Sequence, residues 1–395
     1  MHFAKSVKSI VRRFPSDSPV RKAYNKRKVA AYAARAFSGE QIRKAETDRD
    51  YLRQLLSAYA ARYPEKNETI MESVLRQIMG SAVTAERQND QALKEEIVFC
   101  KLAYGFSPVE FFGYELEGKT ADQRRQYVSD RELMEYVYRM NDRIDISLFN
   151  DKANTYRRFG KYYDREAVAV ETRDDYRDFS GFAEKHGVFV KKKVNGAMGR
   201  DVELIDIRKE GSGPESFFAE LESTGKYLIE ELIVQDKETA VFNESSVNTV
   251  KFLSFLTSKG VRIPYCFMKC GRKGSFVDNG GSGGILVGID LNTGKLDTDG
   301  FDEYHTRYPA HPDSGVIFNG YQLPRFDEAL ALCMHLSPQA PSVRYIGWDL
   351  AYTKGKWVVV EGNGMNQLIG PQLVYERGIK QEIAGIMKEM DLIVG

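Results

Sequence analysis

The segment 348–363, WDLAYTKGKWVVVEGN, places two carboxylates and an amide at the ends of two apolar runs. Gly355, between two lysines, is typical of a turn that joins two antiparallel strands. If the strands pair symmetrically about Gly355, Asp349 lies opposite Glu361. Asn363 then lies on the same face, because side chains alternate between the two faces of a strand. The pattern therefore predicts three oxygen-bearing side chains at one end of a hairpin.

Such a cluster of oxygens suits a divalent cation. Two directly opposed carboxylates repel each other unless positive charge lies between them, and hard cations choose oxygen ligands. We therefore predict that Asp349, Glu361 and Asn363 bind one or two Mg²⁺ ions that also hold a phosphate chain. In the alternative, the carboxylates are exposed at the strand ends or pair with Arg344 and Lys354. A register slip of one residue would move one carboxylate to the other face and remove the site.

A glycine-containing loop upstream is a candidate for contacting that phosphate chain. VFVKKKVNGAMGRDVELI places Lys191 at the end of a predicted strand, with Gly196 and Gly199 in the short loop that follows. Glycine lets backbone amides approach phosphate oxygens closely, and lysine supplies a positive charge. The loop joins two strands, so it is neither a Walker A loop nor a Rossmann fingerprint. A plain glycine hairpin is the alternative.

Two adjacent acids interrupt an apolar strand. KYLIEELIV carries Glu230 and Glu231, and if the strand is buried, one of the two faces the interior. A buried carboxylate needs a polar partner, such as the amino group of an adenine, and Glu238 just beyond could accept hydrogen bonds from ribose hydroxyls. In the alternative, the strand lies at an edge and both acids are solvated.

A second glycine-rich run, GRKGSFVDNGGSGGI, follows a strand-rich segment. Its glycines, together with Asp278 and Asn279, can present several N–H groups to an anion. Arg272, upstream, could stabilise charge on a transferring phosphoryl group or an oxyanion. A flexible surface loop is the alternative reading.

The elements that must position these residues follow from hydrophobic periodicity. Residues 20–140 read as helical, and ETIMESVLRQIMGSAVTAER carries an apolar stripe at helical spacing that we expect in the core. The stripe consists of Ile70, Met71, Val74, Leu75, Ile78 and Met79. Ser129 is a predicted N-cap. From about Asn150 short strands alternate with helices, and from Val247 the chain is rich in strands, which predicts an α+β protein of two or three domains.

Charge is concentrated at the N-terminus, although the formal net charge of the 395 residues is only +1. Residues 1–35 contain a single acid, Asp17, and ten bases, which are Lys5, Lys8, Arg12, Arg13, Arg21, Lys22, Lys26, Arg27, Lys28 and Arg35. This segment could lie on an anionic membrane surface or on an anionic polymer, and a solvated helical arm is the alternative. We expect no nucleic acid as partner, and the oligomeric state stays open.

Other features favour a cytoplasmic protein. The four cysteines, Cys100, Cys266, Cys270 and Cys333, form no CxxC pair and are expected as reduced core residues. No apolar run reaches the roughly 20 residues that span a bilayer, and the charged N-terminus is not typical of a signal peptide. We therefore expect a cytoplasmic protein that could be peripheral to the inner face of the membrane.

Taken in order, the motifs resemble the ATP-grasp superfamily, and in particular its sugar-transfer-associated branch. The general pattern consists of Asn150-Asp151-Lys152, Lys191 with its glycine loop, Glu230-Glu231, Arg272 and Asp349…Glu361-Gly-Asn363. The branch is carried by YGFSPVEFFGYELEGKTADQRRQYVS, SSVNTVKF, GRKGSFVDNGGSGGI, HPDSGVIFNG and YIGWDLAYTKGKWVVVEGN. The similarity covers roughly residues 95–375.

The resemblance implies an α+β ATP-grasp fold, in which two α+β domains clamp a nucleotide, preceded by a helical N-terminal region. The implied segments are a basic helical region (1–90), the helical N-terminal part of the ATP-grasp module (91–150), a small lid domain (151–235) and a C-terminal sheet domain with the metal site (236–395).

The resemblance also implies residue roles. The nucleotide contacts are Lys152, Lys191, Gly196 and Gly199 at the phosphates, Glu230 with the backbone of Glu231 and Ile233 at adenine, and Glu238 at the ribose. The catalytic candidates are Asn248, Lys251 and Arg272, and the metal ligands are Asp349, Glu361 and Asn363. The substrate contacts are Asp278, Asn279, Ser282, Gly283, Gly284 and His311, the last with a structural turn-capping role as its alternative.

The chain departs from the usual pattern of the superfamily at three places. Lys191-Lys192 stands where Lys-Pro is common, and Lys251 stands where an arginine is usual. Gly347 lies two residues before the metal aspartate, where related ligases often have an arginine. This last departure leaves Arg272 as the main candidate for steadying the transition states.

The activity that the resemblance implies is ATP-dependent carboxylate–amine ligation through an acyl phosphate. Its substrates would be small-molecule or glycan-linked acids and amines, related to cell-surface polysaccharide or to amino acids, with ATP and Mg²⁺ as cofactors. A kinase on the same scaffold is one alternative. A non-catalytic nucleotide-binding partner of a glycosyltransferase is the other.

Overall fold

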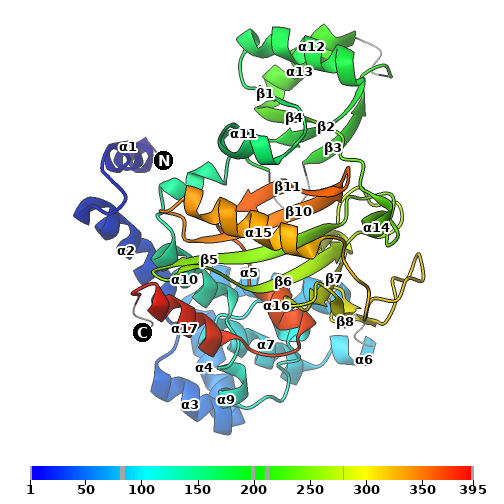
Figure 1. Cartoon of the computed structure of the whole chain (residues 1–395). Coiled ribbons are helices and arrows are strands. Elements are labelled where there is room, and N and C mark those ends of the chain that lie inside the picture. The colour runs from blue at the N-terminus through cyan, green and yellow to red at the C-terminus, as the bar shows by residue number, and fades with distance from the viewer. Residues whose placement is uncertain (1, 81–84, 197–200, 210–212, 279, 393–395) are drawn as a thin grey trace.

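The computed structural model describes residues 2–80, 85–196, 201–209, 213–278 and 280–392. Two antiparallel sheets, of four and seven strands, lie one above the other, and helices from the N-terminal part of the chain lie below the larger sheet (Figure 1). The predicted α+β class with a helical N-terminal region is therefore confirmed. Gly199 and Asn279, two of the predicted ligand contacts, lie outside the described residues.

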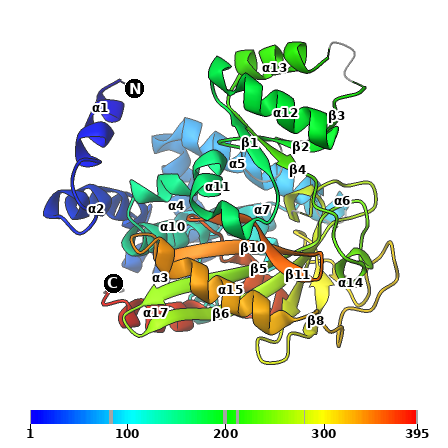
Figure 2. The same ribbon diagram turned by 45° about the horizontal axis from the view of Figure 1, so that its top comes forward.

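The smaller sheet stands above the larger one in Figures 1 and 2. In spatial order its strands are β1 (Ala167–Val170), β4 (Tyr227–Glu231), β2 (Val188–Lys193) and β3 (Val202–Asp206), accompanied by helices α11 (Lys152–Phe159), α12 (Tyr176–His186) and α13 (Gly213–Thr224). Phe189 and Ile229 are buried with the aromatic residues of α12 and α13. Leu228, on the opposite face, packs with Ala153 of α11. Only one face of this sheet is therefore closed by α12 and α13.

The larger sheet forms the centre of the molecule. In spatial order its strands are β11 (Lys356–Asn363), β10 (Tyr345–Thr353), β5 (Thr249–Thr257), β6 (Gly260–Cys270), β7 (Ile285–Ile289), β8 (Leu296–Phe301) and β9 (Arg307–Tyr308). Helices α15 (Phe326–Leu336), α16 (Ile369–Val374) and α17 (Lys380–Glu389) pack on it. Every residue of β10 is buried, including Asp349. A strand so enclosed keeps a charged side chain only where the charge has a partner.

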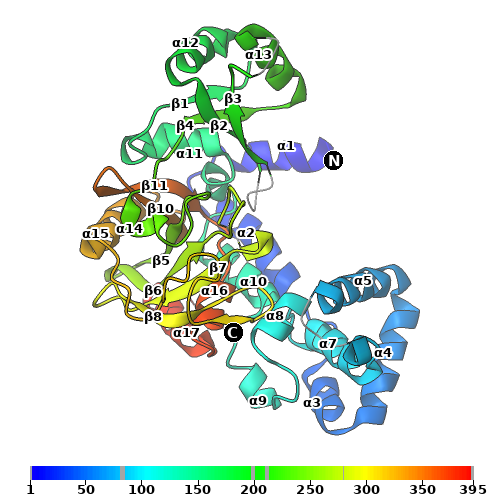
Figure 3. The same ribbon diagram turned by 90° about the vertical axis from the view of Figure 1, so that its right-hand side faces the viewer.

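The N-terminal helices are set to one side of the larger sheet (Figure 3). They are α1 (His2–Val11), α2 (Pro19–Ala33), α3 (Gly39–Thr47), α4 (Arg49–Arg62), α5 (Pro64–Gly80), α6 (Ala85–Gln88), α7 (Gln91–Ala103), α8 (Pro108–Gly113), α9 (Ala121–Arg124) and α10 (Asp130–Met140). The predicted N-cap at Ser129 is confirmed, because its hydroxyl accepts a hydrogen bond from the Glu132 N–H. The predicted core stripe of α5 is only partly right. Val74 and Ile78 are buried, whereas Leu75 and Met79 are exposed on the face away from α4, α7 and α8.

Helix α2 packs along α10 and joins the basic N-terminal segment to the rest of the chain. The guanidinium of Arg21 is buried and lies 2.8 Å from the Asp142 carboxylate and 2.5 Å from that of Asp145. Tyr32 stacks on Tyr138 with ring centroids 5.9 Å apart. These contacts fix α2 while α1 extends beyond it (Figure 2).

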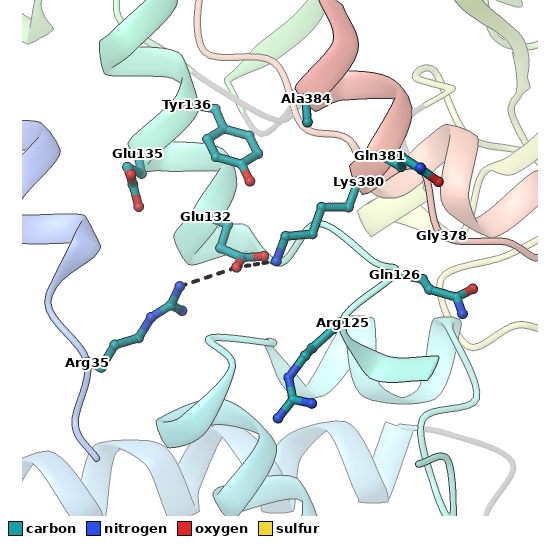
Figure 4. A pocket seen from close by; sticks show the side chains of 10 residues that line it. All are labelled: Arg35, Arg125, Gln126, Glu132, Glu135, Tyr136, Gly378, Lys380, Gln381 and Ala384. Carbon is teal, nitrogen blue, oxygen red and sulfur yellow. Dashed lines mark hydrogen bonds and ion pairs between the residues drawn. The ribbon is translucent and has the colours of Figure 1, made fainter. Parts of the chain in front are cut away.

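A second ionic cluster connects the end of this segment to the C-terminal helix. The buried carboxylate of Glu132 lies 2.6 Å from the Lys380 ammonium and 3.4 Å from the Arg35 guanidinium (Figure 4). The cluster borders a cavity of about 580 Å³ that is also lined by Arg125 and Tyr136. The residues that line this cavity include residues of α10 and α17, and none of them is a predicted metal ligand on β10 or β11.

The cysteines are core residues, as predicted. Cys100, Cys266, Cys270 and Cys333 are all free and buried. Burial raises the pKa of each thiol above its usual range, so the reactive thiolate form is suppressed. None of the described helices is both long and apolar enough to cross a bilayer.

Removing the Arg21 cation tests how α2 is held. We expect Arg21→Met to lower the free energy of unfolding by about 3–5 kcal/mol, because Asp142 then stays buried without its cation. Urea denaturation followed by circular dichroism measures the change. Arg13→Met removes an exposed arginine of the same segment and is expected to change the free energy by less than about 0.5 kcal/mol. Equal midpoints for the two variants would contradict the role of the pair.

Candidate functional site

The hairpin that carries the predicted metal ligands turns through two residues. Lys354 and Gly355 have positive φ angles of 51° and 73°, which match the twist of antiparallel strands. The Asp236 carboxylate accepts hydrogen bonds from both of their N–H groups, at 3.0 and 2.6 Å. Thr353 pairs with Lys356, so the pairing is centred between Lys354 and Gly355. The predicted symmetry about Gly355 is therefore wrong next to the turn.

A bulge nevertheless brings the two carboxylates opposite each other. Leu350 pairs with Val359, whereas Asp349 pairs with Glu361, so Val360 is the extra residue on β11. The predicted pairing of Asp349 with Glu361 is thus confirmed, but for a reason that the hairpin sequence alone does not contain. Without the bulge, the register set by the turn would place Asp349 opposite Val360.

Arg165, just before β1, holds the bulge in place. Its buried guanidinium donates hydrogen bonds to the carbonyl oxygens of Val359 at 2.7 Å and Val360 at 3.3 Å. It also lies 2.9 Å from the Glu230 carboxylate on β4. Arg165 therefore connects the smaller sheet directly to the distorted part of β11. No motif in the sequence points to Arg165, because the residue lies in the loop before β1.

The three predicted metal ligands converge. The Asn363 amide nitrogen lies 3.2 Å from the Asp349 carboxylate and 3.0 Å from that of Glu361. The Asp349 Oδ1 atom is buried without a directed hydrogen bond, although the Lys269 ammonium forms an ion pair with it at 2.9 Å. Two carboxylates and one side-chain amide are a set of ligands that suits Mg²⁺. The described residues contain no cluster of three or more His, Cys, Asp and Glu side chains, so the amide is needed to complete this set.

Two lysines neutralise Asp349 from the neighbouring strands. Lys251 on β5 lies opposite Asp349 with its ammonium 2.7 Å from the carboxylate, while Lys269 approaches from β6. Burial alone would raise the pKa of Asp349, but the two lysines outweigh it and hold the pKa below its ordinary value. Lys251 therefore contacts the predicted metal ligand Asp349. Its ammonium also donates a hydrogen bond to the Asn366 amide oxygen.

Lys269 is a site residue that the sequence analysis missed. Its ammonium lies between Asp349 and Asp278, at 2.9 and 3.5 Å. Burial by itself lowers the pKa of Lys269, but the carboxylates of Asp278 and Asp349 raise it above the usual lysine value. A lysine within the apolar run of β6 was the available signal, because lysine is almost never fully buried without a partner.

Asn366 explains the glycine that precedes the metal aspartate. A Cβ atom added at Gly347 would lie 2.4 Å from the Asn366 side chain, so no larger residue fits there without rearrangement. Lys251 and Lys269 supply the nearby positive charge. Arg272, the predicted substitute, instead pairs with Asp313 on a surface loop through contacts of 2.7 and 3.1 Å. The structure therefore does not bring Arg272 to the predicted metal ligands Asp349, Glu361 and Asn363.

The smaller sheet contributes Lys192 rather than Lys191. Lys192 shares a face with Glu230, and its ammonium lies 2.6 Å from that carboxylate. Lys191 lies on the opposite face and pairs with Glu203 at 2.8 Å. Three consecutive lysines give no indication of which one faces Glu230, and a phosphate contact of Lys191 stays a prediction. Lys152, at the start of α11, lies near Lys192 and Glu230.

The Lys152 ammonium donates a hydrogen bond to the Gly196 carbonyl oxygen. Burial lowers the pKa of Lys152 from the usual lysine value, while nearby Glu361 partly opposes this change. Lys152 and Gly196, two of the predicted phosphate contacts, therefore lie together, with the lysine close to Glu361.

The residues predicted to hold adenine are only partly available. Glu230 is buried in its ion pairs with Arg165 and Lys192, so its carboxylate acts as a link between elements and not as an open acceptor. Glu231, Ile233 and Glu238 are half-buried in and after the end of β4. This stretch runs beside the hairpin turn, where Thr353 donates a hydrogen bond to the Val234 carbonyl oxygen at 2.6 Å.

Three further candidates have structural roles. The Asn248 side chain is buried and bonds to the backbone of Thr239 and Asn243. Asp278 accepts hydrogen bonds from the Thr249 N–H and hydroxyl, at 3.0 and 2.5 Å. His311 is completely buried, as the turn-capping alternative requires. In this structure all three side chains have partners within the protein, and the predicted catalytic role of Asn248 and the predicted substrate contacts of Asp278 and His311 stay predictions.

Both ring nitrogens of His311 are engaged by backbone. Nδ1 accepts a hydrogen bond from the Asp313 N–H at 3.3 Å, and Nε2 lies 2.9 Å from the Gly271 carbonyl oxygen. Of the glycine-rich loop, Gly280–Ser282 forms a short 3₁₀ turn, Gly283 has a positive φ of 84° and Gly284 is buried. Substrate binding by Ser282, Gly283 and Gly284 stays a prediction.

Comparison with known proteins places these observations in context. A family model described as sugar-transfer associated ATP-grasp matches residues 131–388, more than half of the chain. A search of the curated proteins found no match. The similar solved structures include the ATP-grasp ligase PsnB complexed with a phosphomimetic variant of its minimal precursor, Mg and ADP. Identity is 11% over 66% of this chain and 67% of that chain, with a TM-score of 0.40.

Two further solved structures are similar at the same level. One is D-alanyl-alanine synthetase A from Vibrio cholerae, with 9% identity, 62% of this chain and 66% of that chain covered, and a TM-score of 0.37. The other is phosphoribosylamine–glycine ligase from Thermotoga maritima, with 13% identity, 65% and 56% covered, and a TM-score of 0.38.

The adjacent lysines of β2 provide a matched pair of variants. We expect Lys192→Ala to weaken ATP binding by about tenfold or more, because a charge that faces the metal set is removed. Lys191→Ala removes the same charge from the opposite face and should leave affinity within about twofold. Isothermal titration calorimetry measures both. A larger loss for Lys191→Ala than for Lys192→Ala would reverse the assignment.

His311 gives a pH dependence of stability with a defined sign. Burial lowers the pKa of His311 below 6.5, so the unfolded chain binds a proton at higher pH than the folded protein. This contribution to stability is present above the unfolded value and is lost as the pH falls from about 6.5 toward the folded pKa. We expect His311→Gln to flatten the dependence of Tm on pH in that window. His335→Gln, at an exposed position, is the control, and an unchanged slope for His311→Gln would contradict the assignment.

Proposed function

Because the chain belongs to the sugar-transfer associated ATP-grasp family, we propose that it is an ATP-dependent carboxylate–amine ligase. The observation that carries the proposal is the convergence of Asp349, Glu361 and Asn363 at the end of the hairpin. Lysines from both sheets surround the same point. Such an arrangement serves a reaction in which negative charge accumulates on a transferring phosphoryl group.

Residues beside both sheets would bind ATP. Lys152 and Lys192, together with the loop around Gly196, would contact the phosphates from the smaller sheet. The stretch from Glu231 to Glu238, beside the hairpin turn, would hold the adenosine, with Ile233 offering backbone groups to adenine. Lys251 would contact the transferring phosphoryl group from the larger sheet. Mg²⁺ held by Asp349, Glu361 and Asn363 would neutralise charge on the phosphate chain.

The proposed reaction has two displacement steps. A carboxylate oxygen of the acid attacks the γ-phosphorus of ATP, the bond to the bridging oxygen breaks and ADP leaves. The amine nitrogen then attacks the acyl carbon, the carbon–oxygen bond breaks and phosphate leaves, while the amine loses a proton. Lys251 and Lys192 offset the charge that develops in the first step. No covalent protein intermediate is required.

The family description supports a proposal for the class of substrate. Its association with sugar transfer supports an acid or an amine that belongs to a cell-surface polysaccharide, or an amino acid that is attached to one. Such a substrate would be processed in the cytoplasm at the inner face of the membrane. The 280–284 loop, in which Gly281 and Gly283 are exposed, is our candidate for contacting the acceptor.

Release of ADP tests the proposal directly. We expect the protein to form ADP and free phosphate only when a suitable acid and amine are both present, in a screen of carboxylates crossed with amines. Glu361→Gln should lower this rate by about a hundredfold or more, because one of two charged ligands is lost. Glu222→Gln changes an exposed acid on α13 and should leave the rate unchanged.

The products decide between the ligase and its alternatives. Phosphate retained on a hydroxyl of the product, without release of free phosphate, would establish a kinase. Magnesium-dependent ATP binding without ADP formation across the whole panel would favour a non-catalytic nucleotide-binding partner. Turnover by Glu361→Gln at the unaltered rate would show that the metal set has been misidentified.

A further inference from the structure

The first two helices form a basic arm, which we define as residues 8–27. In Figures 1 and 2 the arm lies at the outer side of the molecule, with α1 projecting beyond α2. Buried Arg21 ties it to Asp142 and Asp145, and Asn25 accepts a hydrogen bond from the Arg143 N–H at 3.0 Å. The arm is therefore held in a fixed position although much of its surface is open to solvent.

The charges of the arm lie on its solvent side. Arg21 and Tyr24 contact the segment that follows α10, Arg21 through Asp142 and Asp145 and Tyr24 through Arg143, which leaves the opposite face of α2 outward. That face and the preceding turn carry exposed bases, which are Lys8, Arg13, Lys22, Lys26 and Arg27. Among the described residues, no carboxylate pairs with any of these five. A surface of this kind attracts a polyanionic partner.

Large apolar side chains are exposed on the same arm. The exposed fractions are 55% for Ile10, 42% for Phe14 and 39% for Val20. Isolated surface apolar residues are common, but three within eleven positions of one basic segment are a combination suited to a membrane interface. A purely ionic partner would gain nothing from them, whereas a lipid surface would bury them between its headgroups.

The positive surface continues from the arm onto the body of the protein. Arg12, at the end of α1, donates a hydrogen bond to the Ser147 hydroxyl at the edge of a cavity of about 540 Å³. The same cavity is lined by Arg157 and Arg158 of α11. Its one carboxylate, on Asp145, is already paired with Arg21. Arg157 is paired with Glu171, whereas Arg158 donates a hydrogen bond to the Gln339 carbonyl oxygen and keeps its charge unpaired by any carboxylate among the described residues.

We propose that the basic arm docks the protein onto a bilayer that contains anionic phospholipid. Lys8, Arg13, Lys22, Lys26 and Arg27 contact the lipid phosphates, while Ile10, Phe14 and Val20 enter the interface. The inference needs only this surface and stands apart from the proposed ligase reaction. Its test therefore measures binding of the full chain without nucleotide.

Vesicle co-sedimentation tests the docking. We expect the protein to sediment with vesicles of phosphatidylcholine and phosphatidylglycerol at low ionic strength, and to remain in solution with phosphatidylcholine alone. Replacing Lys22, Lys26 and Arg27 by glutamine should lower the partition coefficient by about a hundredfold, since each basic residue contributes roughly one kcal/mol. The matched control replaces three exposed lysines elsewhere, Lys209, Lys259 and Lys295, and should sediment like the unaltered protein.

The apolar residues separate a membrane from another polyanion. We expect Ile10→Ser combined with Phe14→Ser to lower the partition by about tenfold while leaving all charges in place. Circular dichroism and the melting temperature confirm that both sets of variants are folded. Equal sedimentation with neutral vesicles would overturn the proposal. So would an unaffected Ile10/Phe14 variant together with full displacement by inorganic polyphosphate, which would identify a soluble anionic polymer as the partner.

Discussion

The one-residue bulge at Val360 decides whether two of the predicted metal ligands, Asp349 and Glu361, lie opposite each other. The two-residue turn of the hairpin by itself directs Asp349 toward Val360, and only the extra residue returns Glu361 to its position across the ladder. Arg165 binds the carbonyl oxygens at the bulge, and Glu230 on the smaller sheet holds Arg165. The alignment of two ligands within one sheet therefore depends on an ion pair from the other. This contact therefore links the packing of the two sheets to the alignment of Asp349 with Glu361.

Charge balance is the second requirement. A buried carboxylate opposite another one would be costly, yet Asp349 is held in its ionised form by Lys251 and Lys269 from two neighbouring strands. Asp278 in turn shares the charge of Lys269. Positive charge is therefore already placed beside the predicted metal ligands within the protein itself.

Local pattern was sufficient for much of the fold and for part of the site. Helical periodicity identified the N-terminal helices, although it could not tell that Met79 is exposed. Alternation within a strand cannot choose among consecutive lysines, and it does not show that Lys192, and not Lys191, pairs with Glu230. The bulge depends on Arg165, which lies 195 residues away in sequence. A buried lysine such as Lys269 was visible in the sequence, but its partners on distant strands were not.

The buried thiols have a practical consequence. Because Cys100, Cys266, Cys270 and Cys333 are all enclosed and poorly ionised, maleimide reagents should leave the native protein untouched. A single cysteine introduced on each sheet could then carry a fluorophore without removal of any native residue. Energy transfer between the two dyes would report any change in the separation of the sheets, in a molecule whose core packing is unaltered.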